Sequence, residues 1–171
     1  MAEDNKSMGP GDQGLQDTVI KVYRTAKVVK GGRRFSFGAL VAVGDRNGSV
    51  GVGYGKANEV PPAVEKAIKN AKKNLQGVEL LGGTLPHSIR GKYGATSIDL
   101  IPASPGTGVI AGSTARAILE CAGVRDVLTK IYGSTSAKNV ANAVLDGLLK
   151  LHGQETMSSL RGVEVQAVKR W

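Results

Sequence analysis

The order of apolar and polar residues predicts antiparallel strands in the first third of the chain. Period-two alternation indicates a first strand within residues 15–29, where residues 22–23 interrupt the phase, and a second strand over residues 34–43. The adjacent glycines Gly31 and Gly32 lie between the two strands and allow a tight turn. The pattern therefore predicts a strand, a glycine turn and a second strand.

The second strand is expected to bury one of its faces. Phe35, Phe37 and Val41 occupy alternate positions, which places their side chains on the same side of the strand and predicts that they belong to the core. The segment Asp-Arg-Asn-Gly at residues 45–48 follows as a turn, because Asn and Gly adopt the positive φ values that a tight turn requires. A third strand is then expected from Val50.

The third strand predicts a close contact between backbones. Gly51, Gly53 and Gly55 alternate with larger residues, so one face of this strand has no side chains and lets another backbone approach. A helix is expected next, since the prolines at residues 61–62 are tolerated in a first helical turn. Its expected apolar stripe is Val60, Val64, Ile68, Ala71 and Leu75.

Strands and helices are expected again in the second half of the chain. The pattern predicts strands over residues 84–92 and 95–101, then a helix over 113–121 and a strand over 127–131. A last helix is expected after residues 134–136, Ser-Thr-Ser, because hydroxyl side chains are favourable N-caps. The stripe of this helix is expected to be Ala137, Val140, Val144, Leu148 and Leu151.

These elements predict an α+β protein of two small domains. The first is expected over residues 15–80, as a β-sheet with one helix, and the second over residues 81–153, as a β/α domain. Residues 1–14 contain almost no apolar side chains and are expected to form a disordered tail. Residues 154–171 are weakly patterned and are expected to be loose.

Composition limits the class of protein further. Apolar residues make up 41% of the 171 residues, enough for a packed core, but aromatic residues make up only 4%, so the core is expected to be aliphatic. No apolar run of about 18 residues occurs, and the first residues resemble neither a signal peptide nor a transit peptide. The single cysteine, Cys121, excludes an internal disulfide and fits a reducing compartment. A soluble, cytoplasmic protein is expected.

Positive charge is concentrated in the first half of the chain. The formal net charge is +9, and residues 18–92 hold fourteen Lys and Arg against four Asp and Glu. This distribution is typical of a surface that meets a polyanion, with a merely soluble basic protein as the alternative on charge alone. Lys27, Lys30, Arg33 and Arg34 flank the glycine pair, so they are candidates for phosphate contacts.

No constellation of residues indicates catalysis. His87 and His152 are far apart along the chain, and neither has a Cys or Glu at metal-ligand spacing. Cys121 falls on the apolar part of a helix and is expected to be a buried core residue rather than a nucleophile. The acidic residues are scattered, without an evident pair for acid–base work. We therefore expect no enzymatic activity, no cofactor and no metal.

The strongest competing signal is IPASPGTGVIAGSTAR, residues 101–116. A Gly-rich loop that opens a helix can hold phosphate on its backbone N–H groups. The loop lacks the ending of a Walker A motif, but it is similar to the Pro-x-x-x-Gly-x-Gly phosphate loop of the galactokinase, homoserine kinase and mevalonate kinase group. Since this chain offers no second half for substrate or magnesium, a glycine loop that packs tightly beside a helix is the favoured interpretation.

Several motifs in a fixed order resemble one known family. VKGGRRFSFGALVAVGD, GTLPHSIRGKYG, PASPGTGVIAG and AILECAGVRDVLTKIYGST are similar to segments of the bacterial-type fifth protein of the small ribosomal subunit. The resemblance extends over residues 18–151, most of the chain. Ordered motifs over such a length are far more specific than any single motif.

The resemblance implies a fold and a function. The N-terminal domain is expected to be similar to double-stranded-RNA-binding domains, and the C-terminal β/α domain to be related to the small-molecule kinases without their activity. A member of this family is a structural constituent of the small ribosomal subunit. It binds the 16S-type ribosomal RNA near the decoding region and the path by which messenger RNA enters, and it contributes to subunit assembly and translational accuracy.

The resemblance also implies partners and site residues. The expected protein partners are neighbouring small-subunit proteins, especially the fourth and also the third and eighth, with contacts at Gly106, Gly108 and Arg116. The turn at residues 27–32 is expected to reach toward the head–body junction, near where spectinomycin acts. Residues expected to bind ribosomal RNA are the cations and the glycine pair of the first half: Arg24, Lys27, Lys30, Gly31, Gly32, Arg33, Arg34, Lys56, Lys66, Lys69, Lys72, Lys73, Arg90 and Lys92.

Recognition is expected to rest on phosphate, 2′-OH and shape, because so few aromatic residues are present for base stacking. The sequence departs from the family at residues 113–115, Ser-Thr-Ala, and at residues 136–138, Ser-Ala-Lys. Both departures lie in the C-terminal domain, so they bear on its protein contacts.

Overall fold

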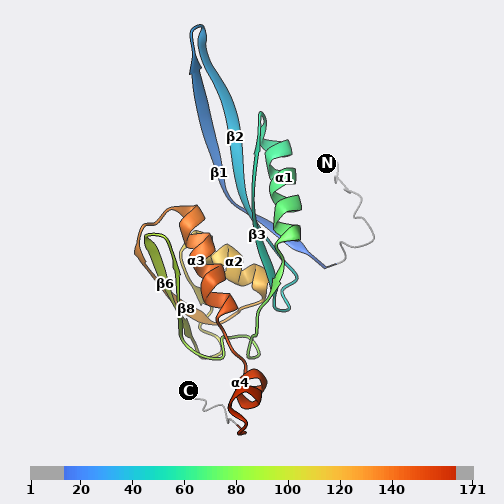
Figure 1. Cartoon of the computed structure of the whole chain (residues 1–171), viewed down its shortest axis with the longest axis vertical. Helices are drawn as coiled ribbons and strands as arrows, with labels where there is room; N and C mark the ends of the chain where they lie inside the picture. Colours follow the sequence, from blue (N-terminus) through green and yellow to red (C-terminus); the bar gives the residue numbers. More distant parts are fainter. Residues whose placement is uncertain (1–13, 165–171) are drawn as a thin grey trace.

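The fold combines two antiparallel-rich sheets with four helices, and it confirms the predicted α+β class (Figure 1). A computed structural model describes residues 14–164. Nearly all of the predicted N-terminal tail and the last seven residues of the predicted C-terminal tail therefore lie outside the described residues.

The first sheet has the strand order β1-β2-β3-β4, with every neighbouring pair antiparallel. Helix α1 packs against one of its faces. These elements are β1 (Gln16–Val29), β2 (Gly32–Gly44), β3 (Ser49–Ala57), α1 (Val60–Lys73) and β4 (Gln76–Gly77).

The second sheet has the order β5-β6-β8-β7, in which only the β7–β8 pair is parallel. Helices α2 and α3 pack together beside it, and α4 follows at the C-terminal end (Figure 1). These elements are β5 (Ile89–Tyr93), β6 (Thr96–Pro102), β7 (Val109–Ile110), α2 (Ser113–Ala122), β8 (Val127–Gly133), α3 (Ala137–Leu149) and α4 (Gln154–Arg161).

The irregular phase of the first strand is caused by a β-bulge. Val19 pairs with Val41 and Lys21 pairs with Leu40, so Ile20 is an extra residue on β1. A bulge exchanges the two faces of a strand for all residues that follow it. Residues on either side of the bulge therefore obey opposite alternation, which is why a single period-two pattern did not fit the segment.

Glycines on β3 let helix α1 lie almost on the strand backbone. A Cβ atom added at Gly53 would lie 2.1 Å from the carbonyl oxygen of Ala67 and 2.4 Å from the backbone nitrogen of Ala71. This confirms the predicted close approach at the glycine face. Alanine is the largest side chain that such a short separation admits on the helix.

The predicted apolar stripe of α1 was wrong in its centre for this reason. The fully buried residues are Ala63, Ala67 and Ala71, which face the glycines, whereas Val64 and Ile68 are only half-buried at the side of the contact. Bulky residues mark the edges of this interface rather than its middle. A prediction from hydrophobicity alone therefore placed the buried face of the helix at the wrong angle around the helix axis.

Both faces of β2 are covered, so the two predicted domains share a core. Val41 and Val43 pack with α1 on one face, while Leu40 and Ala42 belong to the cluster that includes the residues of α2 and α3. Cys121 is 3% exposed in that cluster, as predicted. The first sheet is thus the central layer between α1 and the second domain.

Main-chain hydrogen bonds join the two domains at the 45–48 turn. The N–H of Arg46 donates to the carbonyl oxygen of Cys121 at 2.9 Å, and the N–H of Gly48 donates to that of Ala122 at 2.9 Å. Gly123 ends α2 with φ 96°, and a Cβ there would lie 2.1 Å from the carbonyl oxygen of Arg46. The turn therefore packs directly against the C-terminal end of α2.

Phe35 is not a core residue, contrary to the prediction. Its side chain is 44% exposed, and the Arg24 guanidinium lies 3.7 Å from the centre of its ring. Figure 1 shows why: the tips of β1 and β2 project past the end of α1, where no other element is present to cover them. The arginine takes the place of a covering layer through a cation–π contact.

Two predicted boundaries in the second domain also differ. Residues 84–88 are not part of a strand, because the strand starts at Ile89 and Leu81 forms only an isolated bridge with Thr84. The last long helix does follow Ser136, but no side chain caps it. Its first turn instead follows a local bend in which the Ser136 N–H donates to Ser134 Oγ at 3.3 Å.

Residues 154–161, predicted to be loose, form helix α4, which is held by Glu79 of the segment between the domains. The carboxylate of Glu79 accepts hydrogen bonds from the Gly153 N–H and from the Thr156 hydroxyl, the latter at 2.7 Å. Glu79 thereby satisfies free donors at the start of the helix, in the manner of an N-cap supplied from a distant part of the chain. Sequence periodicity around residue 154 gives no sign of this partner.

We expect α4 to lose its anchorage at acidic pH. The hydrogen bonds from Gly153 and Thr156, and to a smaller degree the charge of His152, hold the pKa of the Glu79 carboxyl below its usual range. A carboxylate whose pKa is lowered in the docked state stabilises docking. This stabilisation is fully present above the usual pKa of a glutamate, and it is lost as the pH falls through the lowered pKa.

Hydrogen-exchange protection factors for residues 154–161 would measure this, at about pH 7 and about pH 3. Protection should fall with pH in the wild type, and Glu79→Gln should already show the low protection at neutral pH. Glu120→Gln, on an exposed face of α2, is the control and should behave as the wild type. Equal protection in the wild type at both pH values would contradict the proposed anchoring role.

Candidate nucleic-acid interface

The tips of β1 and β2 form a basic arm, defined here as residues 21–35. The arm projects beyond the rest of the molecule (Figure 1). Its turn uses Gly32 with φ 138°, a conformation that side-chain-bearing residues rarely adopt. Six cations and no acidic residue occur between residues 18 and 44: Lys21, Arg24, Lys27, Lys30, Arg33 and Arg34.

All six cations of the arm are exposed. None of them forms an ion pair with a carboxylate within residues 14–164. Opposite residues on paired strands lie on the same face of a sheet. Lys27 pairs with Arg34 on one face, and Val28 pairs with Arg33 on the other, so both faces of the arm present positive charge. Such an arm can contact phosphate groups on two sides.

The lysines of α1 and Lys56 of β3 lie on opposite sides of the first sheet. Lys66, Lys69 and Lys73 are exposed on the helix surface that points away from the buried alanines, and Lys72 is half-buried. Lys56 pairs with Gly38 and belongs to the other face of the sheet. The predicted RNA-binding residues are therefore divided between two surfaces, with the arm common to both.

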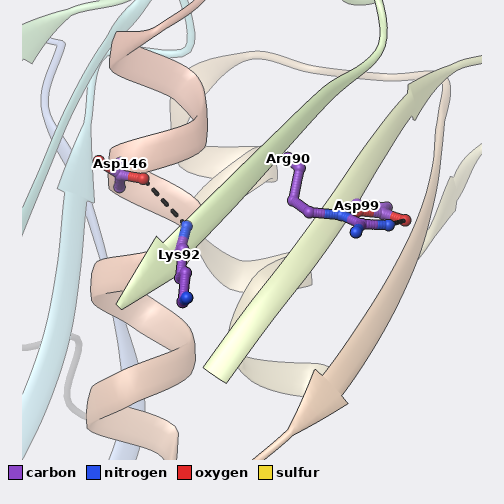
Figure 2. Close-up of polar contacts among 4 residues, drawn as sticks. All are labelled: Arg90, Lys92, Asp99 and Asp146. Carbon is purple, nitrogen blue, oxygen red and sulfur yellow. Dashed lines mark hydrogen bonds and ion pairs between the residues drawn. The ribbon is translucent and has the colours of Figure 1, made fainter. Parts of the chain in front are cut away.

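Arg90 and Lys92 lie on β5 in the second domain and differ in how far their charges are compensated. Arg90 forms a two-point contact with Asp99 on β6, with distances of 2.5 Å from Nε to Oδ1 and 2.7 Å from Nη2 to Oδ2 (Figure 2). This hydrogen bonding lowers the pKa of the Asp99 carboxyl below its ordinary value. The charge of Arg90 is thus compensated within the sheet.

Lys92 leaves its ammonium group available. Its backbone N–H donates to Asp146 Oδ2 at 2.9 Å, whereas its side chain extends away from Asp146 (Figure 2). Asp146 also accepts a hydrogen bond from the ammonium group of Lys150 at 2.6 Å. Of the two predicted residues on β5, only Lys92 therefore offers an uncompensated charge.

The glycines of the 101–116 segment serve turn geometry rather than tight packing, contrary to the favoured interpretation from sequence. Gly106 and Gly108 have φ values of 90° and 78°, and a Cβ at either position would meet nothing within 4 Å. The Gly108 N–H donates to Asp126 Oδ1 at 2.9 Å. The Asp126 carboxylate thus accepts the hydrogen bond of a backbone N–H that a phosphate-binding loop would donate to its phosphate.

Arg116 lies beside this loop, where its guanidinium donates to the carbonyl oxygen of Val109 at 2.9 Å. Together with Arg46 and Arg125 it lines an open cleft of about 690 Å³. Gly108 also lines this cleft, so the structure brings two of the three predicted protein-contact residues together, and Gly106 lies two positions earlier in the same loop.

The two histidines lie close together, although they are far apart in sequence. The backbone N–H of His152 donates to His87 Nε2 at 3.3 Å, next to the Glu79 anchor of α4. Within residues 14–164 no group of three or more His, Cys, Asp or Glu side chains is arranged to hold a metal ion. No helix in this part of the chain is long and apolar enough to cross a membrane.

Two cations escaped the sequence prediction, Lys21 and Lys138. Lys21 lies directly after the bulge of β1, and its position opposite Leu40 follows only from the shifted register. Lys138 lies in the first turn of α3, 115 positions after Tyr23, yet its ammonium nitrogen is 5.6 Å from the centre of the Tyr23 ring. The contact depends on how the two domains pack, which no local pattern in the sequence shows.

An exposed basic arm without acidic partners, on a sheet that shares its core with a second α+β domain, is typical of the class of nucleic-acid-binding proteins. Comparison with known families gives the particular member of that class. The description "Ribosomal protein S5, N-terminal domain" matches residues 15–79, and "Ribosomal protein S5, C-terminal domain" matches residues 91–161. The chain belongs to the ribosomal protein S5 family.

Relatives of similar length support this assignment. The chain is 52% identical to the small ribosomal subunit protein uS5 of Syntrophobacter fumaroxidans over 155 residues, which cover 91% of this chain and 93% of that protein. It is 50% identical to uS5 of Rhodopirellula baltica over 160 residues, or 93% and 90% of the two chains. It is 48% identical to uS5 of Persephonella marina over 164 residues, or 95% and 84%.

Family membership confirms the broad predictions from sequence. The chain is a structural protein of the small ribosomal subunit and not an enzyme, and its partners are the ribosome and ribosomal RNA. Its predicted location in the ribosome is confirmed on the same basis.

Proposed function

We propose that the basic arm binds small-subunit ribosomal RNA near the decoding region and the path by which messenger RNA enters. The observation that carries this proposal is the arm itself, with its six exposed cations and no acidic residue between positions 18 and 44. A narrow two-stranded projection can enter a space between RNA helices, where phosphate groups lie on both of its sides. Cations on both faces fit that position.

The arm is suited to recognition of shape rather than of sequence. Phe35 is its one aromatic side chain besides Tyr23, and the Arg24 guanidinium lies over the Phe35 ring, in a position where a base would otherwise stack. Lysine and arginine donors instead contact phosphate and 2′-OH groups, which are presented by any folded RNA in a geometry that depends on its shape. Through these contacts the protein stabilises the assembled subunit, and through its place near the decoding region it contributes to translational accuracy.

The second domain is proposed to contact neighbouring small-subunit proteins, especially the fourth and also the third and eighth. The cleft beside Gly108 supports this role, because its open surface carries three arginines, Arg46, Arg116 and Arg125, against one acidic residue, Glu120. Val109 fixes the Arg116 guanidinium through its carbonyl oxygen and so presents it in one orientation. A surface of this kind suits an acidic protein segment.

Sedimentation of the tagged protein in a sucrose gradient of cell lysate tests the proposed function. Co-migration with the small subunit is expected at low salt and should survive high salt, since a protein held by many contacts is not released by screening alone. A protein that stays at the top of the gradient would instead be a free RNA-binding protein. If the protein co-migrates with the small subunit, chemical footprinting of the ribosomal RNA would locate the nucleotides that the arm contacts.

A further inference from the structure

Two tyrosines and a lysine from the other domain meet at the base of the arm. The rings of Tyr23 on β1 and Tyr54 on β3 are 6.2 Å apart and nearly perpendicular, at 70°. The ammonium nitrogen of Lys138 lies 3.5 Å from the centre of the Tyr54 ring and 5.6 Å from that of Tyr23. Figure 1 shows α3, which carries Lys138 in its first turn, beginning beside the base of the arm.

Strand register places further cations on the same face of the sheet. Lys21 is opposite Leu40, which is opposite Tyr54, and the next row joins Tyr23, Gly38 and Lys56. The Lys27–Arg34 pair continues this face toward the tip. We call this surface the tyrosine face, made of Lys21, Lys27, Arg34, Lys56 and Lys138 around Tyr23 and Tyr54.

A glycine makes this arrangement possible. A Cβ at Gly38 would lie 2.3 Å from the hydroxyl oxygen of Tyr54, so the Tyr54 ring lies across Gly38 toward Tyr23. The ammonium nitrogens of Lys21 and Lys56 lie 5.6 Å and 5.9 Å from the ring centres of Tyr23 and Tyr54. Three lysines therefore surround one pair of rings.

The rings hold cations rather than bind bases. The Lys138 ammonium group lies over the face of the half-buried Tyr54 ring, where a base would otherwise stack, and a cation–π contact orients an ammonium group without using its N–H donors. Within residues 14–164 none of the five cations of the tyrosine face forms an ion pair with a carboxylate. The rings orient three of these five uncompensated cations, and a surface of this kind suits a polyanion.

We propose that RNA backbone binding extends from the arm along the tyrosine face onto the second domain, where Lys138 contacts a phosphate. One continuous RNA segment thus touches both domains. This inference rests on the proposed function, because it assigns that RNA to one face of the arm and adds Lys21 and Lys138 to its contacts. Since Lys138 is held by the tyrosines before RNA arrives, little side-chain freedom is lost on binding.

The test measures binding of the full-length protein to an in vitro transcript of small-subunit ribosomal RNA at several salt concentrations. Lys138→Met removes the charge but keeps an unbranched side chain, and we expect it to weaken binding several-fold at about 0.1 M salt and to lower the salt slope by about one unit or less. Lys138→Arg keeps the charge and should bind nearly as the wild type.

Lys150→Met is the matched control. Lys150 lies just beyond the opposite end of α3, about 18 Å along the helix axis, so it changes the net charge equally without touching the tyrosine face. Its RNA binding should equal that of the wild type. Unchanged RNA binding by Lys138→Met would overturn the inference. Weaker binding with an unchanged salt slope would also overturn it, because that result shows a role of Lys138 in domain packing alone.

Failure of this inference is distinguishable from failure of the proposed function. A triple alanine variant of the arm tip, Lys30, Arg33 and Arg34, serves as the reference in the same assay. If only this variant loses affinity, Lys138 and the second domain are not part of the contact, and the arm assignment stands. If neither variant loses affinity, the proposed RNA contact of the arm is wrong as well.

Discussion

Gly53→Ala is expected to destabilise the protein by about 3 kcal/mol or more, the upper range of overpacking substitutions. The added methyl group would lie 2.1 Å from the Ala67 carbonyl oxygen and 2.9 Å from the Ala71 Cα atom, both of which are backbone atoms that cannot rotate away. Relief requires α1 to move off the sheet, which opens the packing of Ala63, Ala67 and Ala71. Such a loss is between about a fifth and three fifths of the roughly 5–15 kcal/mol by which native proteins are stable.

Urea-induced unfolding measures this effect, with Gly77→Ala as the matched control. A Cβ at Gly77 meets nothing within 4 Å, and its backbone does not require a positive φ, so the same substitution should leave stability within about 0.5 kcal/mol. A midpoint for Gly53→Ala equal to that of the control would show that the helix can move without cost. Gly91 on β5 makes the equivalent contact in the second domain, 2.1 Å from the Ala143 carbonyl oxygen, and Gly91→Ala should be comparably harmful.

The second large effect is on RNA binding. Replacing Lys30, Arg33 and Arg34 together by alanine is expected to reduce affinity for small-subunit ribosomal RNA on the order of 100-fold at about 0.1 M salt and to lower the salt slope by roughly two to three units. Each of the three side chains is exposed and contacts no acidic partner among the described residues. Their removal therefore leaves folding stability nearly unchanged while it removes three phosphate contacts.

A variant with the same change in net charge controls for non-specific attraction. Lys130, Lys150 and Arg161 are exposed in the second half of the chain, and their triple alanine variant should bind RNA within a few-fold of the wild type. The result that would falsify the arm assignment is equal affinity of the arm variant and the wild type at moderate salt. Equal losses in the two variants would mean that overall charge, and not the arm, determines binding.

Local patterns predicted the parts of the structure that local forces decide. The glycine turn at the arm tip, the glycine face of β3 and the burial of Cys121 all follow from backbone freedom or hydrophobicity at single positions. The order of the predicted elements supplied the α+β class, and the family motifs then supplied the ribosomal role. These features needed no knowledge of what each element packs against.

The features that the sequence did not predict depend on tertiary partners. Phe35 was assigned to the core by alternation, but the arm extends past every element that could cover it. Helix α4 depends on Glu79, and the charge of Arg90 is compensated by Asp99 on a neighbouring strand. In each case the deciding partner is remote in sequence or absent from that part of space, so periodicity carries no information about it.

The turn at residues 45–48 has a mechanical consequence. Main-chain hydrogen bonds from Arg46 and Gly48 to the end of α2 tie the second domain to the strands of the arm at that turn, so a rotation of the second domain about the turn would carry the arm with it. Strand β2 contains 13 residues, which at about 3.3 Å each gives a lever of roughly 43 Å, so a rotation of about 5° at the second domain displaces the arm tip by roughly 4 Å. Under the proposed function, a small rotation of the second domain would therefore reach the RNA-binding tip of the arm as this larger displacement.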